Sequence, residues 1–140
     1  MVDRVLNMSP GKSIEAVKVL PASEELFQDH FPGFPVVPAV LLTEMMAQAS
    51  GKCLYAESSD RGYPVLLKIK QANFRKWAEP GQNIKLYADV SSSKQDYATV
   101  KCYAKVNGTK ICSAELFFGF IEKDKFADTE DTPEIFSING

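Results

Sequence analysis

Two residues in the first third of the chain have side chains that can exchange protons with a bound molecule near neutral pH. His30 is the only histidine among the 140 residues, and imidazole is well suited to act as a general base at that pH. Glu44 follows fourteen positions later, since 44 − 30 = 14. A carboxyl group kept protonated by nonpolar surroundings can act as a general acid. The two residues are therefore candidates for a complementary base and acid.

His30 by itself favours a structural role. It lies in the segment 29–38, DHFPGFPVVP, whose three prolines and one glycine predict a rigid loop. A single histidine in such a loop is usually held by a local hydrogen bond and takes no part in chemistry. The spacing of His30 alone therefore does not define a site.

Glu44 lies in a segment that predicts a buried helix. Pro38 suits a first helical position, and residues 39 to about 55 are rich in helix-forming residues. Nonpolar residues cover nearly all sides of this helix, and Gly51 is either an imperfection in it or its early end. A carboxylate here is costly to bury unless it is paired or protonated. Two interpretations remain open: an exposed face at a subunit contact, or an acid held in a nonpolar pocket with Gln48, one turn later, restraining it.

The rest of the chain predicts strands. Their expected ranges are 13–20, 63–76, 83–91, 96–106 and 109–122, with a short helix opened by Ser23. Because no second long helix separates the later strands, the sheet should be antiparallel. The predicted fold class is α+β: one domain over residues 1–122, with a bent sheet wrapped around a central helix, followed by an acidic tail over residues 123–140.

Asn107-Gly108 predicts a two-residue hairpin turn between two of these strands. Under that turn Val106 pairs with Thr109, and counting outward places Cys102 and Cys112 on opposite faces of the sheet. A disulfide within the hairpin is therefore not expected. The odd number of scattered cysteines favours reduced thiols and a cytoplasmic setting.

Composition argues against several other functions. With 16 basic and 18 acidic residues the net charge is −2, which favours neither nucleic acid nor an anionic membrane as a partner. Residues 1–10 lack the nonpolar core of a signal peptide, and the longest nonpolar stretch, 36–42, is too short to span a bilayer. There is no G-x-S-x-G or G-x-G-x-x-G motif, and one histidine with scattered cysteines predicts no metal site.

The loop and the helix together resemble a known signature. His30-Phe31-Pro32-Gly33-Phe34-Pro35-Val36-Val37-Pro38-Ala39-Val40-Leu41, followed by Glu44 and Ala47-Gln48, is similar to the active-site motif of the beta-hydroxyacyl-[acyl-carrier-protein] dehydratases of the glutamate type. Segments 3–5, 74–76 and 80–81 extend the resemblance over roughly the first 120 residues. It implies the hot-dog fold, no cofactor, and elimination of water from a 3-hydroxyacyl thioester to give the trans-2-enoyl thioester.

The resemblance also implies roles for individual residues. His30 would be the general base and Glu44 the general acid, contributed by different chains of a homodimer; a trimer of dimers is common in this branch. The N–H of Ala39 would bind the thioester oxygen, while Val36, Gly33 and Gln48 would orient the reacting groups. This family usually has glycine where Ala39 stands, so the range of substrates is the property most open to change.

An acyl carrier protein is the partner that the resemblance implies. Four basic residues, Lys68, Lys70, Arg75 and Lys76, are either its docking site or a solvated strand face. Met45, Met46 and the phenylalanines of the loop either line an acyl tunnel or pack in the core. An acyl thioesterase and a non-catalytic acyl-binding protein of the same fold remain alternative functions, and acyl chain length and pathway stay open.

Overall fold

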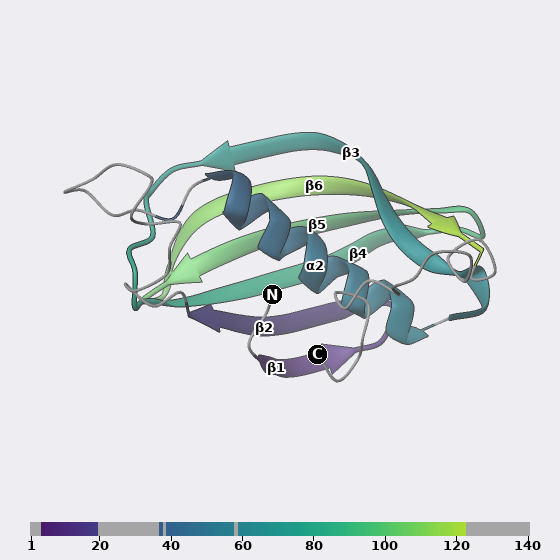
Figure 1. Ribbon diagram of the computed structural model, residues 1–140, viewed down its shortest axis with the longest axis horizontal. Coiled ribbons are helices and arrows are strands. Elements are labelled where there is room, and N and C mark those ends of the chain that lie inside the picture. The colour runs from purple at the N-terminus through teal and green to yellow at the C-terminus, as the bar shows by residue number, and fades with distance from the viewer. Residues whose placement is uncertain (1–3, 20–36, 38, 58, 123–140) are drawn as a thin grey trace, which may run out of the picture.

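A single long helix lies across the concave side of one antiparallel sheet (Figure 1). The computed structural model describes residues 4–19, 37, 39–57 and 59–122. The elements in chain order are β1 (Arg4–Ser9), β2 (Ser13–Val19), α2 (Ala39–Glu57), the short 3-10 helix η1 (Ser59–Arg61), β3 (Tyr63–Phe74), β4 (Asn83–Ser93), β5 (Tyr97–Val106) and β6 (Thr109–Ile121). The six strands are ordered β1-β2-β4-β5-β6-β3, and every neighbouring pair is antiparallel.

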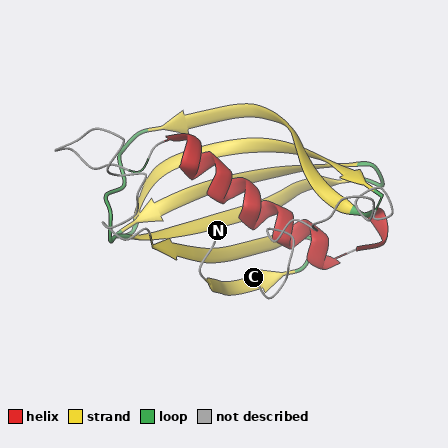
Figure 2. Ribbon diagram, in the orientation of Figure 1, coloured by secondary structure: helices red, strands yellow, loops and turns green. Residues whose placement is uncertain are grey.

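The predicted architecture is confirmed. Figure 2 shows the strands curving around the one long helix, the hot-dog arrangement that the resemblance implies. The helix runs through Gly51 and ends at Glu57, so this glycine does not terminate it. The predicted short helix after Ser23, the loop over 29–38 apart from Val37, and the tail over 123–140 lie outside the described residues. None of the described helices is long and nonpolar enough to cross a membrane.

The core lies between the helix and the concave face of the sheet. Alternate residues of β4, β5 and β6 point inward, because side chains alternate along a strand. The largest buried side chains from the two layers include Ile14, Leu42, Met45, Met46, Leu54, Ile84, Leu86, Val100, Leu116 and Phe118. Burying one such side chain contributes about 1.5–3 kcal/mol, so this layer fixes which side of α2 faces the sheet.

The hairpin between β5 and β6 has the predicted turn but not the predicted register. Asn107 and Gly108 have φ values of 52° and 78°, and Val106 pairs with Thr109. A bulge at Ile111 then shifts the pairing by one residue, so that Cys112 lies opposite Ala104. Cys102 and Cys112 consequently both face the core, and the prediction that they lie on opposite faces is wrong. Both are free thiols, as is Cys53.

The reason for the bulge is a contact that local sequence does not reveal. The carbonyl of Ile111 accepts hydrogen bonds from the backbone N–H groups of Arg75 and Lys76, at 2.8 and 3.2 Å. These bonds come from the chain just beyond β3, on the opposite side of β6 from β5. The carbonyl of Ile111 therefore bonds to the chain beyond β3, and Ile111 has no paired residue in β5.

Candidate functional site

Glu44 lies on the side of α2 that faces away from the sheet. Glu44 is exposed in the single chain. Val40, one turn earlier, is also exposed, at 80 % of its maximal accessible area. Leu42, Met45 and Met46 occupy the opposite side of the helix and are buried. The single chain therefore does not enclose this carboxyl group, and the nonpolar pocket stays a prediction. The alternative, a helix face open to a second subunit, agrees with this exposure.

Gln48 lies between Glu44 and the interior. Its side chain is only 5 % exposed, and its Nε2 donates a hydrogen bond of 3.4 Å to Oε1 of Glu44. The amide oxygen of Gln48 is buried and has no hydrogen-bond partner among the described residues. A buried acceptor without a partner is unfavourable by about 1–3 kcal/mol. The Gln48 side chain is therefore oriented so that its Nε2 binds Glu44, and its Oε1 remains available to accept a hydrogen bond from another group.

Ala39 is the first residue of α2 and is exposed. The first four N–H groups of a helix have no partner within it and point along the positive end of the helix dipole. This position suits a donor to a developing negative charge on a bound thioester oxygen. The preceding Val37 is buried, and its N–H donates to the carbonyl of Ala78 at 2.8 Å. That bond ties the start of the helix to the segment that follows β3.

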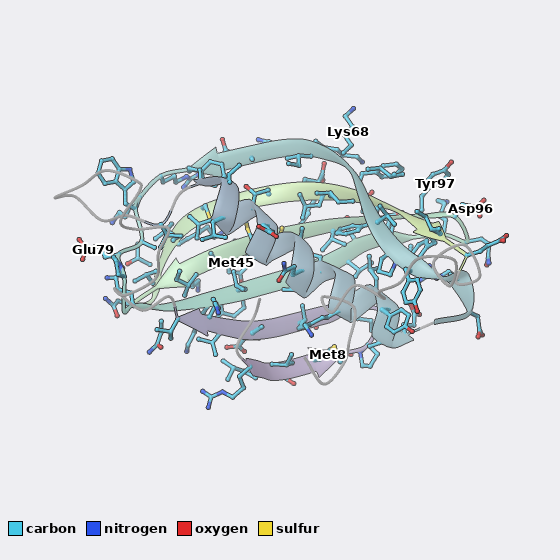
Figure 3. The ribbon with its side chains drawn as sticks, in the orientation of Figure 1. Met8, Met45, Lys68, Glu79, Asp96 and Tyr97 are labelled. Atoms are coloured by element: carbon cyan, nitrogen blue, oxygen red, sulfur yellow. The ribbon has the colours of Figure 1, made fainter. Side chains whose placement is uncertain are left out.

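The remaining site residues predicted from the sequence belong to the loop and to the buried side of α2. His30, Gly33 and Val36 lie outside the described residues, as do Phe31 and Phe34. Met45 and Met46 are fully buried, and Figure 3 shows Met45 between α2 and the sheet, which agrees with core packing. The acyl tunnel predicted from these methionines stays a prediction.

Four large nonpolar side chains are exposed near β3 and the beginning of α2. Ile69 and Phe74 pair with Leu116 and Cys112, so they point to the concave side. On the convex side Leu67 lies over Gly119, where a Cβ atom would be 2.7 Å from its Cδ1. Trp77 follows the strand and is 65 % exposed. Exposed nonpolar side chains on both sides of an edge strand are typical of an interaction site, and the sequence prediction did not include them.

Lys52 is absent from the predicted site, yet it belongs to the same polar stripe. It follows Gln48 by four residues, as Gln48 follows Glu44, so the three share one side of the helix. Lys52 is 3 % exposed, and its burial lowers the pKa of its amine. The spacing 44, 48 and 52 in a nonpolar helix was the signal that could have identified it.

The four predicted docking residues do not form one cluster. Lys68 and Lys70 belong to β3, and Lys70 lies on the convex side, with its Nζ 5.3 Å from the centre of the Phe117 ring. Lys68 projects away from the strand (Figure 3). Arg75 and Lys76 lie beyond the end of β3, bound through their backbone N–H groups to Ile111. All four are exposed, so their role as a docking site stays a prediction.

Solved structures with this architecture come from several kinds of protein. The fluoroacetyl-CoA thioesterase FlK superposes with a TM-score of 0.71 at 18% identity, covering 91% of this chain and 99% of FlK. A chain of the dehydratase heterocomplex ApeI:P from Xenorhabdus doucetiae gives 0.71 at 15% identity, covering 94% and 89%. Similarity at these identities establishes the fold alone.

Sequence comparison is more specific. A family model described as FabA-like domain matches residues 1–115. The 3-hydroxyacyl-[acyl-carrier-protein] dehydratase FabZ of Levilactobacillus brevis is 42% identical over 118 residues, covering 84% of this chain and 80% of the relative. The FabZ of Listeria monocytogenes is 34% identical over 126 residues, covering 89% and 88%. The chain therefore belongs to the FabA-like family, and within it the chain is similar to the FabZ dehydratases.

Proposed function

We propose that this protein is a 3-hydroxyacyl-[acyl-carrier-protein] dehydratase of fatty-acid or related acyl-chain biosynthesis. The observation that carries this function is the 42% identity to a FabZ dehydratase over 84% of the chain. The open face of α2, with Glu44 exposed and Gln48 bound to it, supports the same reaction. Its product is the trans-2-enoyl thioester, and its protein partner is the acyl carrier.

In the proposed mechanism His30 removes a proton from C2 of the acyl chain. The C2–H electron pair becomes the C2–C3 double bond, and the C3–O bond breaks. Glu44, protonated, gives its proton to the departing hydroxyl group, which leaves as water. Negative charge that builds up on the thioester oxygen is stabilised by the N–H of Ala39 at the start of α2. The carbonyl of Val36 orients the imidazole, and Gly33 belongs to the same group of backbone and orienting residues.

The active unit in this proposal is a homodimer. Glu44 and Val40 are exposed in the single chain, and β3 is an edge strand with nonpolar side chains at positions 67 and 69. An exposed nonpolar edge of a sheet is ordinarily covered by another element or by another chain. In such a dimer the resemblance implies that Glu44 of one chain meets His30 of the other. Three such dimers could assemble further, and free cysteines agree with a cytoplasmic setting.

The proposal is tested by presenting a 3-hydroxyacyl carrier-protein thioester and following the enoyl product. We expect wild-type turnover, and a loss of about 10²–10⁴-fold in kcat for both His30→Ala and Glu44→Gln. Glu79→Gln, which alters an exposed carboxylate in the turn before β4, is the matched control and should retain full activity. Full activity of both site variants would contradict the mechanism. Release of free thiol in place of enoyl product would indicate a thioesterase, and carrier binding without product would indicate a non-catalytic acyl-binding protein.

A further inference from the structure

Three lysines form a single row across three strands on the convex face of the sheet. Lys85 of β4 is directly opposite Lys105 of β5, and Lys105 is directly opposite Lys110 of β6. Their neighbours along the strands, such as Ile84 and Ala104, are buried in the core, so the lysines point to the other side. They are far apart in the sequence, and only the pairing of the strands brings them together.

Two tyrosines lie under the ammonium groups of Lys105 and Lys110. Tyr87 and Tyr103 are opposite each other and stack with ring centres 4.8 Å apart. The Nζ of Lys105 lies 5.5 and 5.7 Å from the two ring centres, and that of Lys110 lies 4.4 Å from Tyr103. Cations over aromatic rings are attracted to them, which limits the motion of the side chains. Two of the three lysines, Lys105 and Lys110, are therefore held in defined positions.

Glu15 of β2, opposite Tyr87, is the carboxylate nearest the row, and it interacts with the hydroxyl group of that tyrosine. Like charges directly opposite each other on a sheet are destabilising, and none of the three lysines forms an ion pair with a described carboxylate. Asp89 and Glu115, the acids of the same face in β4 and β6, lie on either side of Lys101. Two depressions, of about 300 and 340 Å³, border the row. An arrangement that is unfavourable in the free chain indicates an anionic partner.

Lys105 and Lys110 flank the turn between β5 and β6, and this turn lies at the end of the molecule where α2 begins (Figure 1). Two sets of backbone hydrogen bonds connect the lysine row to the start of α2 through the segment that follows β3. Ile111, next to Lys110, accepts from Arg75 and Lys76, and three residues further on Ala78 accepts from Val37 at the start of the helix. The lysine row, the pair Arg75–Lys76 and the helix start therefore belong to one end of the fold. Asp96 and Tyr97 lie at the opposite end from Glu79 (Figure 3).

We infer that Lys85, Lys105 and Lys110, with Arg75 and Lys76 beside them, dock an acidic helix of the acyl carrier protein; this rests on the proposed function. Neighbouring strands are about 4.8 Å apart, close to the roughly 5–6 Å between side chains four residues apart on a helix. A helix lying across the strands can therefore match a carboxylate to each lysine. A long polyanion such as nucleic acid would continue past the row and meet Asp89 and Glu115.

The decisive experiment compares two substrates that carry the same acyl group. One is the 3-hydroxyacyl carrier-protein thioester, and the other is the 3-hydroxyacyl N-acetylcysteamine thioester, which has no protein to dock. For Lys105→Glu/Lys110→Glu we expect at least about a tenfold rise in KM for the carrier substrate, with kcat/KM for the small thioester unchanged. The KM of the wild type for the carrier should also rise with salt more steeply than that of the variant.

The matched control is Lys12→Glu/Lys94→Glu. Both residues are exposed, and they lie near the turns that join β1 to β2 and β4 to β5, at the other end of the sheet. This variant has the same change in net charge and should retain the wild-type KM. Equal effects of the two double variants, or no effect of the first, would overturn the proposal. Far-UV circular dichroism establishes that all variants are folded.

Failure of the docking proposal can be told apart from failure of the proposed reaction. If neither substrate turns over, the dehydratase function is wrong, and direct titration with the holo carrier protein still tests the surface. Carrier binding that is lost in Lys105→Glu/Lys110→Glu and kept in the control supports the dock. Carrier binding that survives the change overturns it. A fluorescent single-stranded oligonucleotide that binds the row more tightly than the carrier does would also overturn it.

Discussion

Gln48 donates a hydrogen bond of 3.4 Å from its Nε2 to Oε1 of Glu44, and this links a buried amide to an exposed carboxyl group. The two residues are one helical turn apart on the side of α2 that faces away from the sheet core. The bond limits the orientations open to the Glu44 side chain, and it requires the amide of Gln48 to point outward. Gln48 is therefore a positioning residue for the proposed acid.

Gln48→Leu is expected to lower kcat by about tenfold with little change in KM, because an interaction that orients the acid in the reacting state is removed. The melting temperature should hold or rise, since the same change removes a buried amide oxygen that has no described partner. Steady-state kinetics and thermal unfolding measure both effects. Ser50→Ala removes a buried hydrogen bond of 2.8 Å to Met46 on the same helix, and should reduce stability without changing kcat. The opposite pattern in the two variants would contradict the assignment.

Ala39→Pro tests the proposed donor at the start of α2. Proline is tolerated at the first position of a helix but has no N–H to offer the thioester oxygen. We expect kcat to fall by about 10²-fold or more while the helix content by circular dichroism is kept. Ala39→Gly retains the N–H and is the control: its kcat should remain near that of wild type, and its preference among acyl chains of different length should change. Equal kcat in Ala39→Pro and wild type would remove this N–H from the mechanism.

A site shared between two chains makes a quantitative prediction for mixed dimers. His30→Ala and Glu44→Gln are each expected to be inactive alone. If the chains exchange at random, half of the dimers are mixed and one of the two sites in each is intact, so about a quarter of wild-type activity returns. Activity measured after co-refolding equal amounts of the two variants tests this. Recovery of no activity would place His30 and Glu44 in the same chain's site, or remove one of them from it.

The exposed nonpolar side chains of the edge strand β3 should be needed for dimer formation and therefore for activity. Ile69→Lys places a charge on an exposed nonpolar position of the concave side, where burial against a second chain would strand it. We expect the molecular mass in sedimentation to fall to that of one chain, together with the loss of turnover. Tyr97→Lys, at a similarly exposed position on β5, is the control and should leave the mass unchanged.

Cysteine burial predicts how stability depends on alkaline pH. Burial raises the pKa of Cys53 and Cys112 to about 11 and that of Cys102 to about 12, from 9.0. Because the folded chain favours the protonated thiols, their contribution is complete below pH 9 and is lost as the pH rises through 11 to 12. Unfolding by denaturant, measured from pH 8 upward, should show a decline that is smaller in a Cys53→Ala/Cys112→Ala variant. An identical slope in both proteins would contradict the assignment.

Local patterns were sufficient to predict α2 and five of the six strands, whereas β1 (Arg4–Ser9) was not predicted. Helix-forming residues from Ala39 onward predict α2, and alternating runs predict strands whose ends agree with the structure to within about two residues. The turn at Asn107-Gly108 follows from the backbone freedom of these two residues, both of which have positive φ. Such features depend on neighbours in the sequence, so they can be recognised without knowing the fold.

Residues distant in the sequence decided the rest. Glu44 was expected in a buried helix and is exposed, because α2 is buried on all sides only from Gln48 onward and its first turns are open on one side. The bulge that places Cys102 and Cys112 on one face depends on bonds from Arg75 and Lys76, more than thirty residues earlier.

The sequence by itself determined which residues can do chemistry, His30 and Glu44, since their types and their fixed separation are local facts. Only the tertiary structure decided that Lys85, Lys105 and Lys110 form one row. Lys85 and Lys105 are twenty residues apart and Lys105 and Lys110 are five apart, and these separations do not by themselves predict that the side chains are neighbours. The three lysines become neighbours only because three antiparallel strands pair in register, which sets adjacent strands about 4.8 Å apart.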